Sequence, residues 1–186
     1  MIRSHASESA SKLAAKATGS PRFVEAEAAA CCASPVRVFA QRSDLTIDLP
    51  ELLRATRSYF DATVDVQSRS EPQAPDGDRI EVRLRCEKHG YEGRLTIHSR
   101  RTTEHDRADA RDAERAGRAA GMSSLADRCP TIWDVESVGE DSELARLNLC
   151  GILAAVALGP VLPDDCSTLY GVRGAMERVD RLLKAR

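Results

Sequence analysis

The sequence has few aromatic residues and none of the common catalytic or nucleotide-binding motifs. Phe, Trp and Tyr make up 4% of the 186 residues, and Trp133 is the only tryptophan. No GxGxxG, GxxxxGK[ST], GxSxG or HExxH pattern is present. The usual signatures of dinucleotide sites, P-loops, serine hydrolases and zinc proteases are therefore excluded. The core has to be built mainly from Leu, Val, Ile and Ala.

Long apolar runs are scarce as well. The N-terminal region lacks the apolar segment of a secretory signal. A charge-free run of 17 residues, 147–163, reaches only the short limit for a membrane span and contains Gly159 and Pro160. We expect this run to form a buried core helix, and we expect no membrane partner. The six cysteines are then expected to be reduced thiols of a cytoplasmic protein.

The overall composition is that of an ordinary globular protein. Hydrophobic residues make up 42% and charged residues 30% of the chain, and the formal net charge is −2. This charge gives no global field that would favour nucleic acid. Residues 1–34 are rich in Ala and Ser and carry few large apolar side chains. We therefore predict a mobile tail at 1–34 and a single domain at 35–186.

Periodic patterns predict both strands and helices in the first half of the domain. Apolar residues alternate at 36–40 and 45–49, as in half-buried strands. Pro50 then opens an apolar helical face that runs to Phe60. A hairpin follows at 79–98, with one apolar face.

The second half of the domain is expected to be mostly helical. Thr103 begins a Thr-x-x-Asp pattern, which is typical of a capped helix start. A strand is expected at 131–138, a buried helix at 142–159 and an amphipathic helix at 167–185. The order strand, strand, helix, hairpin, helix, strand, helix, helix predicts an α+β fold. We expect an antiparallel sheet with helices packed on one face.

The C-terminal helix carries one apolar stripe at spacings of three and four residues: Leu169, Val172, Met176, Val179 and Leu183. This stripe can pack on the buried helix of the same chain or pair with a second copy. About two heptads are too few for a stable free coiled coil, so we favour packing within the chain. A homo-oligomer is the alternative.

The hairpin pattern allows two registers. A two-residue turn at His89-Gly90 would place Leu84 opposite Leu95. A four-residue loop over 87–90 would place Val82 opposite Leu95 instead. Both registers keep the apolar faces together, because the side-chain period of a strand is two.

The outward face of this hairpin is rich in arginine. Residues 79–101 contain seven basic and three acidic side chains. The arginines expected to project together as a candidate partner-binding surface are Arg79, Arg83, Arg85, Arg94 and Arg100. Arg85 and Arg94 are expected roughly opposite each other, where like charges destabilise a sheet unless something compensates them. RNA-binding sheets add exposed aromatic residues, and only Tyr91 is near, so an acidic protein partner fits better than nucleic acid.

Cys86 and His89 have the spacing of one half of a zinc knuckle. A structural zinc site needs four ligands, and the sequence offers no second close pair. Cys86 also falls on the apolar face of its strand, where a free cysteine acts as a small hydrophobe. We therefore interpret the pair mainly as part of a hairpin, and keep a zinc site at Cys86 and His89 as an alternative; no other cofactor is indicated.

A nucleophilic cysteine is a further alternative. Cys166 follows Asp164 and Asp165 and precedes a predicted helix, whose dipole would favour the thiolate. A cysteine nucleophile also needs a histidine partner, which the sequence does not place. We expect a small cytoplasmic protein-interaction or adaptor module rather than an enzyme, with a zinc-binding protein and a reactive-cysteine enzyme as alternatives.

The predicted tail leads to a first test. Deleting residues 1–34 is expected to leave the melting temperature within about 2–4 °C of the full chain, the shift that roughly 1 kcal/mol produces in a domain of this size. Differential scanning calorimetry of the two proteins measures this. A larger drop would mean that the segment packs on the domain.

Overall fold

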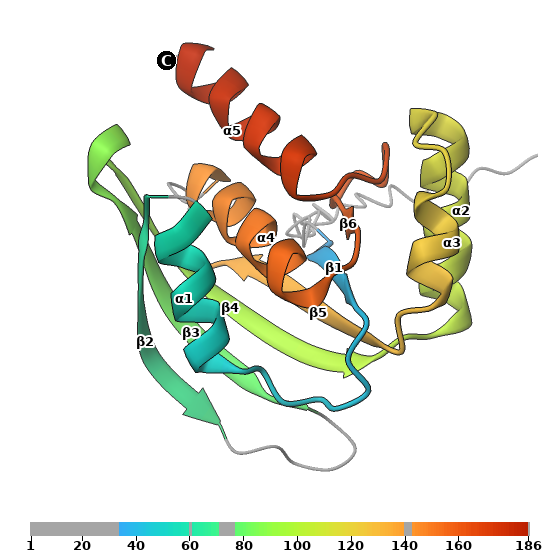
Figure 1. Cartoon of the computed structure of the whole chain (residues 1–186), viewed down its shortest axis with the longest axis horizontal. Coiled ribbons are helices and arrows are strands. Elements are labelled where there is room, and N and C mark those ends of the chain that lie inside the picture. Colours follow the sequence, from blue (N-terminus) through green and yellow to red (C-terminus); the bar gives the residue numbers. More distant parts are fainter. Residues whose placement is uncertain (1–33, 60, 71–76, 140–142, 186) are drawn as a thin grey trace, which may run out of the picture. The chain divides into compact units, whose positions relative to one another are not determined.

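The computed structural model describes residues 34–59, 61–70, 77–139 and 143–185, so the predicted tail lies outside the described residues except for Ser34. The described residues belong to one compact unit, Ala33–Arg186. This unit is an α+β structure built on an antiparallel sheet (Figure 1).

Six strands form the sheet within the described ranges, in the order β2-β3-β4-β5-β1-β6. Their bounds are β1 Val36–Ala40, β2 Thr63–Ser70, β3 Arg79–Cys86, β4 Tyr91–Arg101, β5 Thr131–Ser137 and β6 Val161–Leu162. Every neighbouring pair is antiparallel. The helices are α1 Leu49–Tyr59, α2 Glu104–Gly117, α3 Met122–Asp127, α4 Glu143–Ala157 and α5 Val172–Ala185, with a 3-10 turn η1 at Glu87–His89.

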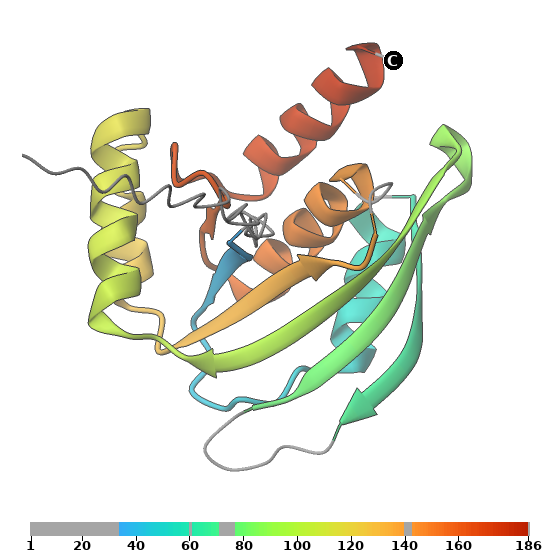
Figure 2. The same cartoon turned by 180° about the vertical axis from the view of Figure 1, so that it is seen from behind.

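Helices α1, α4 and α5 lie on one side of the sheet (Figures 1 and 2). Helix α4 packs on the sheet beside α1, and α5 packs on α4. Apolar side chains surround α4 because it is apolar on nearly every side; Leu149, Ile152 and Leu153 are fully buried. The predicted antiparallel sheet with helices packed on one face is confirmed for these three helices.

The opposite face of the sheet is covered at one end by α2 and α3. Side chains alternate along a strand, so Phe39 of β1 points away from the core that holds its neighbour Val38. Phe39 packs in a second cluster with Ile132 and with Ala110 and Ala113 of α2. The small residues of α2, which lacks large apolar side chains, thus allow it to lie close to the sheet.

One local prediction is confirmed in detail, and one open alternative is decided. The hydroxyl of Thr103 accepts a hydrogen bond from the Asp106 amide at 3.3 Å, and the Asp106 carboxylate accepts one from the Thr103 amide at 2.9 Å. This reciprocal pair is the capping box that starts α2. The hairpin adopts the four-residue loop, with Val82 opposite Leu95. Arg83 rather than Arg85 therefore lies opposite Arg94, which corrects the expected pairing.

Two other local predictions are wrong. Residues 45–49 do not form a strand; Ile47 is buried, and its amide donates to the Asp78 carboxylate at 2.9 Å. The apolar stripe is also shorter than expected, because Leu169 precedes α5 and packs in the second cluster, while Met176 is 44% exposed. Val179 is buried, so the predicted packing of α5 within the chain is confirmed.

The two edges of the sheet differ. At the β6 edge, Val161 pairs with β1 on one side and exchanges two backbone hydrogen bonds with Tyr170 on the other. At the opposite edge, the described residues of β2 pair with β3 alone, and a register shift after Val66 interrupts that ladder. Among the described residues, the sheet is thus closed by the chain at one side and open at the other.

Substituting Val179 with Asp tests the packing of α5. An unpaired carboxylate against α4 is expected to lower the free energy of unfolding by at least about 2 kcal/mol, measured by urea denaturation. Arg181→Asp, on an exposed position of the same helix, is the control and should change stability much less. A folded Val179→Asp protein that only changes from dimer to monomer would contradict this packing.

Candidate functional site

The predicted arginine surface is partly neutralised within the chain. Arg83 pairs with Glu92 at 2.7 Å and Arg85 pairs with Asp65 at 2.6 Å. The Arg83 guanidinium accordingly lowers the pKa of Glu92. Arg79 and Arg94 are exposed and form no ion pair among the described residues. Two of the five predicted arginines therefore remain available at this face.

Arg100 lies on the same face of β4, but it is held in an ionic cluster under α2. Its guanidinium contacts Asp134 at 2.6 Å and Asp106 at 2.8 Å. Arg37 of β1 contacts Asp106 at 3.0 Å and Asp109 at 2.7 Å. The structure thus gives Arg100 partners within its own chain and removes it from the exposed arginine surface.

The electrostatics of this cluster indicate a structural role. Burial opposes ionisation of Asp106, but hydrogen bonds from Arg100, Thr103 and Arg37 outweigh it and hold the pKa of this carboxyl well below its usual range. Burial raises the pKa of Asp134 despite its bond to Arg100. Because the buried charges of α2 and the sheet neutralise each other, the cluster joins α2 to β1, β4 and β5.

Cys86 and His89 are not brought together with further metal ligands. Cys86 is 1% exposed, and its thiol lies 3.7 Å from the backbone carbonyl of Asp61. His89 is exposed on η1 and stacks on Tyr91 with 6.5 Å between ring centroids. The described ranges contain no group of three or more His, Cys, Asp or Glu placed to hold a metal ion. The geometry therefore gives a zinc site no support.

Cys166 is partly exposed, and among the described residues its thiol forms no hydrogen bond with a histidine. The Arg37 guanidinium donates to its sulfur at 3.3 Å. The helix expected after Cys166 begins only at Val172, so the anticipated helix dipole does not act on this thiol. Burial raises the pKa of Cys150 to about 12 and that of Cys129 to about 11. Cys150 and Cys129 are thus poorly suited to nucleophilic catalysis.

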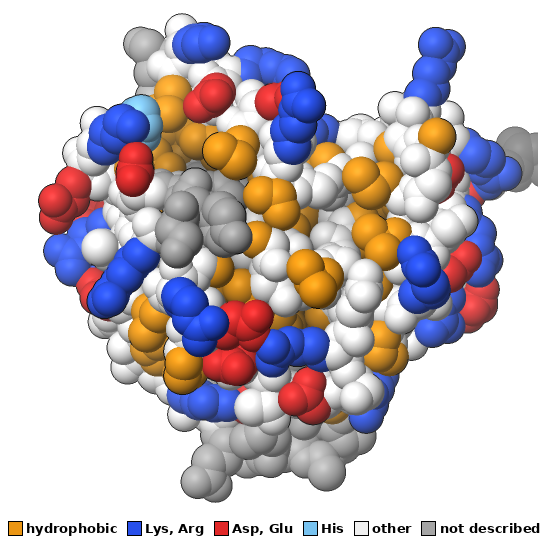
Figure 3. Space-filling model, viewed as in Figure 1, with side chains coloured by type: hydrophobic (Ala, Val, Ile, Leu, Met, Phe, Trp, Pro, Cys, Tyr) orange, Lys and Arg blue, Asp and Glu red, His pale blue; other side chains and the backbone are white. Residues whose placement is uncertain are grey.

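An apolar groove that the sequence did not reveal lies where α3, the end of α4 and the start of α5 meet. Its volume is about 420 Å³, and its lining consists of Met122, Leu125, Ala154, Ala155, Leu158, Gly159, Pro160, Gly171 and Val172. Leu158 is 66% exposed. Figure 3 shows hydrophobic side chains gathered over this part of the surface, with Lys and Arg side chains at its border. This is the candidate functional site.

Local backbone requirements position Leu158 in the groove. Leu158 follows the last turn of α4 and has a φ of 53°, the left-handed conformation that ends many helices. A Cβ atom at Gly159 would lie 2.0 Å from the backbone oxygen of Phe39, so only glycine fits there. The tight turn sends the chain into β6 and leaves Leu158 outside the core. In the sequence, the Leu-Gly-Pro run at 158–160 marks the end of the helix and could have indicated that Leu158 lies outside the core.

Comparisons with family models, curated proteins and solved structures found no match. Within the described ranges, no helix is both long and apolar enough to cross a membrane.

The ionic cluster gives a stability prediction. Asp106→Asn is expected to lower the free energy of unfolding by roughly 3 kcal/mol, because it removes the buried carboxylate that Arg37 and Arg100 share and leaves each of them one carboxylate instead of two. Asp112→Asn, on the exposed side of α2, is the matched control and should cost less than about 1 kcal/mol. Chemical denaturation at neutral pH measures both.

The same pair of proteins predicts a pH dependence. The folded state lowers the pKa of Asp106, so its contribution is complete above the unfolded-state pKa of about 3.9 and is lost as pH falls below it. The stability difference between wild type and Asp106→Asn should stay constant at neutral pH and shrink on acidification below about pH 4. A difference that grows on acidification would contradict the assigned role of Asp106.

Proposed function

We propose that this chain is a small protein-interaction module that binds an amphipathic helix of an acidic partner protein in the apolar groove. The observation that carries the proposal is the exposure of Leu158 beside an open groove of about 420 Å³ lined by apolar residues of α3, α4 and α5. Contiguous apolar surface of this kind is typical of interaction sites.

The shape of the groove supports a helical partner. Its walls are helix faces and a turn, and the strand edge that would receive an extended peptide lies elsewhere, at β2. Amphipathic helices dock in such grooves through apolar residues spaced three or four positions apart. Alanines at 154 and 155 and the glycine at 171 leave room for the larger side chains of a partner.

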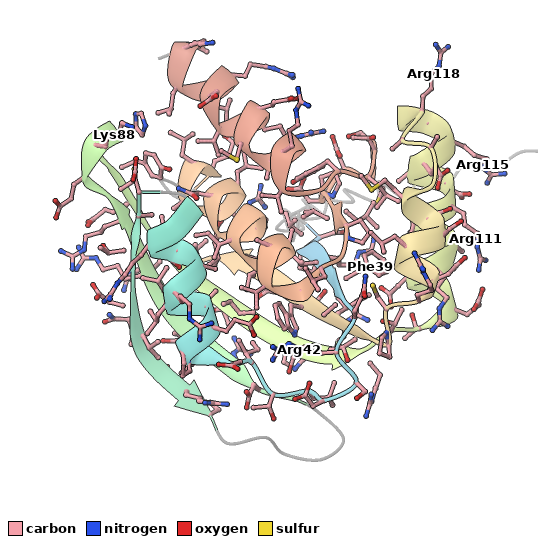
Figure 4. All side chains as sticks on the ribbon, viewed as in Figure 1. Phe39, Arg42, Lys88, Arg111, Arg115 and Arg118 are labelled. Carbon is pink, nitrogen blue, oxygen red and sulfur yellow. The ribbon has the colours of Figure 1, made fainter. Side chains whose placement is uncertain are left out.

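Basic residues on α2 and α3 support an acidic partner. Arg128 follows the groove residue Leu125 by three residues, and Arg118 stands at the end of α2 with its side chain directed away from α4 and α5 (Figure 4). Both are exposed and form no ion pair among the described residues. Arg79 and Arg94 on the open sheet face supply a second place for acidic groups. Charge complementarity of this kind increases association rates and selects partners.

The proposed place of action is the cytoplasm. Four cysteines of the described ranges, Cys86, Cys129, Cys150 and Cys166, are free thiols. Free thiols persist in reducing compartments, which supports an intracellular role within this proposal.

Leu158→Asn tests the proposed groove. Asn tolerates the left-handed backbone of this position and removes the apolar contact without adding charge. Proteins captured from a native lysate of the source organism by the wild-type chain are identified by mass spectrometry, and helical peptides from them are titrated by fluorescence anisotropy. We expect binding to the Leu158→Asn variant to be about tenfold weaker or worse, because a buried leucine contributes about 1.5–3 kcal/mol.

Val138→Asn is the matched control, because Val138 is also an exposed apolar residue, at 45%, but lies outside the groove. This variant should bind like the wild type. Equal binding by the wild type, Leu158→Asn and Val138→Asn would contradict the proposal. The same holds if every protein captured by the wild type is also captured by Leu158→Asn. A wild-type dimer that Leu158→Asn converts to a monomer would show a second copy as the occupant and contradict the partner assignment.

A further inference from the structure

A second cavity, of about 180 Å³, lies between the tip of the hairpin and α5. Lys88, labelled in Figure 4, marks the hairpin tip. The side chains that line the cavity are Asp61, Lys88, His89, Tyr91, Asn148, Met176, Val179 and Asp180. The wall is thus contributed by the α1–β2 connection, the hairpin, α4 and α5, and the volume is suited to a small molecule only.

The charges of this cavity favour a cation. Asp61 pairs with Lys88 at 3.2 Å, so these two charges balance each other. Asp180 forms no ion pair among the described residues. The cavity therefore presents two carboxylates and one ammonium group, and the Asp180 carboxylate has no ion-pair partner among the described residues.

The hydrogen-bonding groups favour a ligand with N–H donors and an oxygen acceptor. Asn148 is 2% exposed in the apolar helix α4, and its Nδ2 donates to the hydroxyl oxygen of Tyr91. Its Oδ1 has no hydrogen-bond donor within the described residues. The Tyr91 oxygen accepts from Asn148, and its own O–H lies beside the Cys86 thiol, which a ligand oxygen would replace as the acceptor. A buried acceptor without a donor is unusual, because no hydrogen bond offsets the free energy lost when the acceptor is removed from water.

We propose that this cavity binds a small primary ammonium compound that carries a nearby hydroxyl or carboxylate oxygen. The ammonium group pairs with Asp180 and, once the buried Asn148 side chain turns its Oδ1 toward the cavity, supplies the donor that this oxygen lacks. The oxygen of the ligand accepts from the Tyr91 hydroxyl, which burial keeps protonated by raising its pKa. The apolar parts of Met176 and Val179 contact the methylene groups. This site is separate from the apolar groove and does not depend on the proposed partner.

The test uses three small probes that differ by one property each. Ethanolamine has the ammonium and the hydroxyl, choline keeps the charge and the hydroxyl but has no N–H donor, and ethylene glycol has no charge. Each is titrated into the full chain and followed by two-dimensional amide NMR, which includes the Asn148 side chain. We expect ethanolamine to shift signals of Asn148, Tyr91 and α5 at millimolar concentration, with choline and ethylene glycol at least about tenfold weaker.

Two substitutions on α5 distinguish binding at this cavity from a general effect of the net charge of the helix. Asp180→Asn should weaken ethanolamine binding about tenfold or more, whereas Glu177→Gln, an equal charge change on α5 at an exposed position, should leave it unchanged. Leu158→Asn should also bind ethanolamine normally, so the two proposals fail independently. Absence of localised shifts, equal affinity for choline, or unaltered binding by Asp180→Asn would overturn the proposal.

Discussion

The burial of α4 is the constraint on which the rest of the structure depends. This helix is apolar on nearly every side, so no single neighbour can remove it from water. The sheet covers one side, and α1 and α5 cover the others. Both candidate sites occur where this cover is incomplete. The groove exposes the C-terminal end of α4, and the small cavity lies over Asn148, where the hairpin tip and α5 diverge.

A second interface, of different character, joins α2 to the far side of the sheet. Alanines provide a close approach but little apolar area, and the ionic cluster around Asp106 supplies the specific contacts. Buried ion pairs contribute less to net stability than apolar packing does, but they fix one arrangement strongly, because any other leaves a buried charge unpaired. The need to pair these buried charges fixes the position of α2. Because α3 packs on α2 and lines the groove, the same pairing also places one wall of the groove.

Local chemistry made much of the fold predictable. The capping box at Thr103, the hairpin with one apolar face and the buried α4 all follow from spacings within a few residues. The segment 45–49 was misassigned because alternation alone does not distinguish a strand from an extended connection whose amide finds a carboxylate, here Asp78. The hairpin register was left open because both choices bury the same face.

The candidate sites were less predictable than the fold, for a physical reason. The alternation of side chains along β4 correctly places Arg100 on the same face as Arg94. Its partners Asp106 and Asp134, however, come from a helix and a strand that only the tertiary structure brings together. The walls of the groove are likewise distant in sequence, from Met122 to Val172. A polar Asn148 within an apolar helix was the one local sign of the small cavity.

The unequal edges of the sheet limit how this protein can self-associate through its backbone. Open strand edges are templates for intermolecular pairing, and fibrils require two such edges on each molecule. Here Tyr170 occupies the backbone hydrogen-bonding groups of Val161 in β6, and β2 is the open edge among the described strands. Pairing of β2 with β2 of another molecule consumes both open edges. For the described strands, growth by strand addition would therefore stop at a closed two-fold dimer.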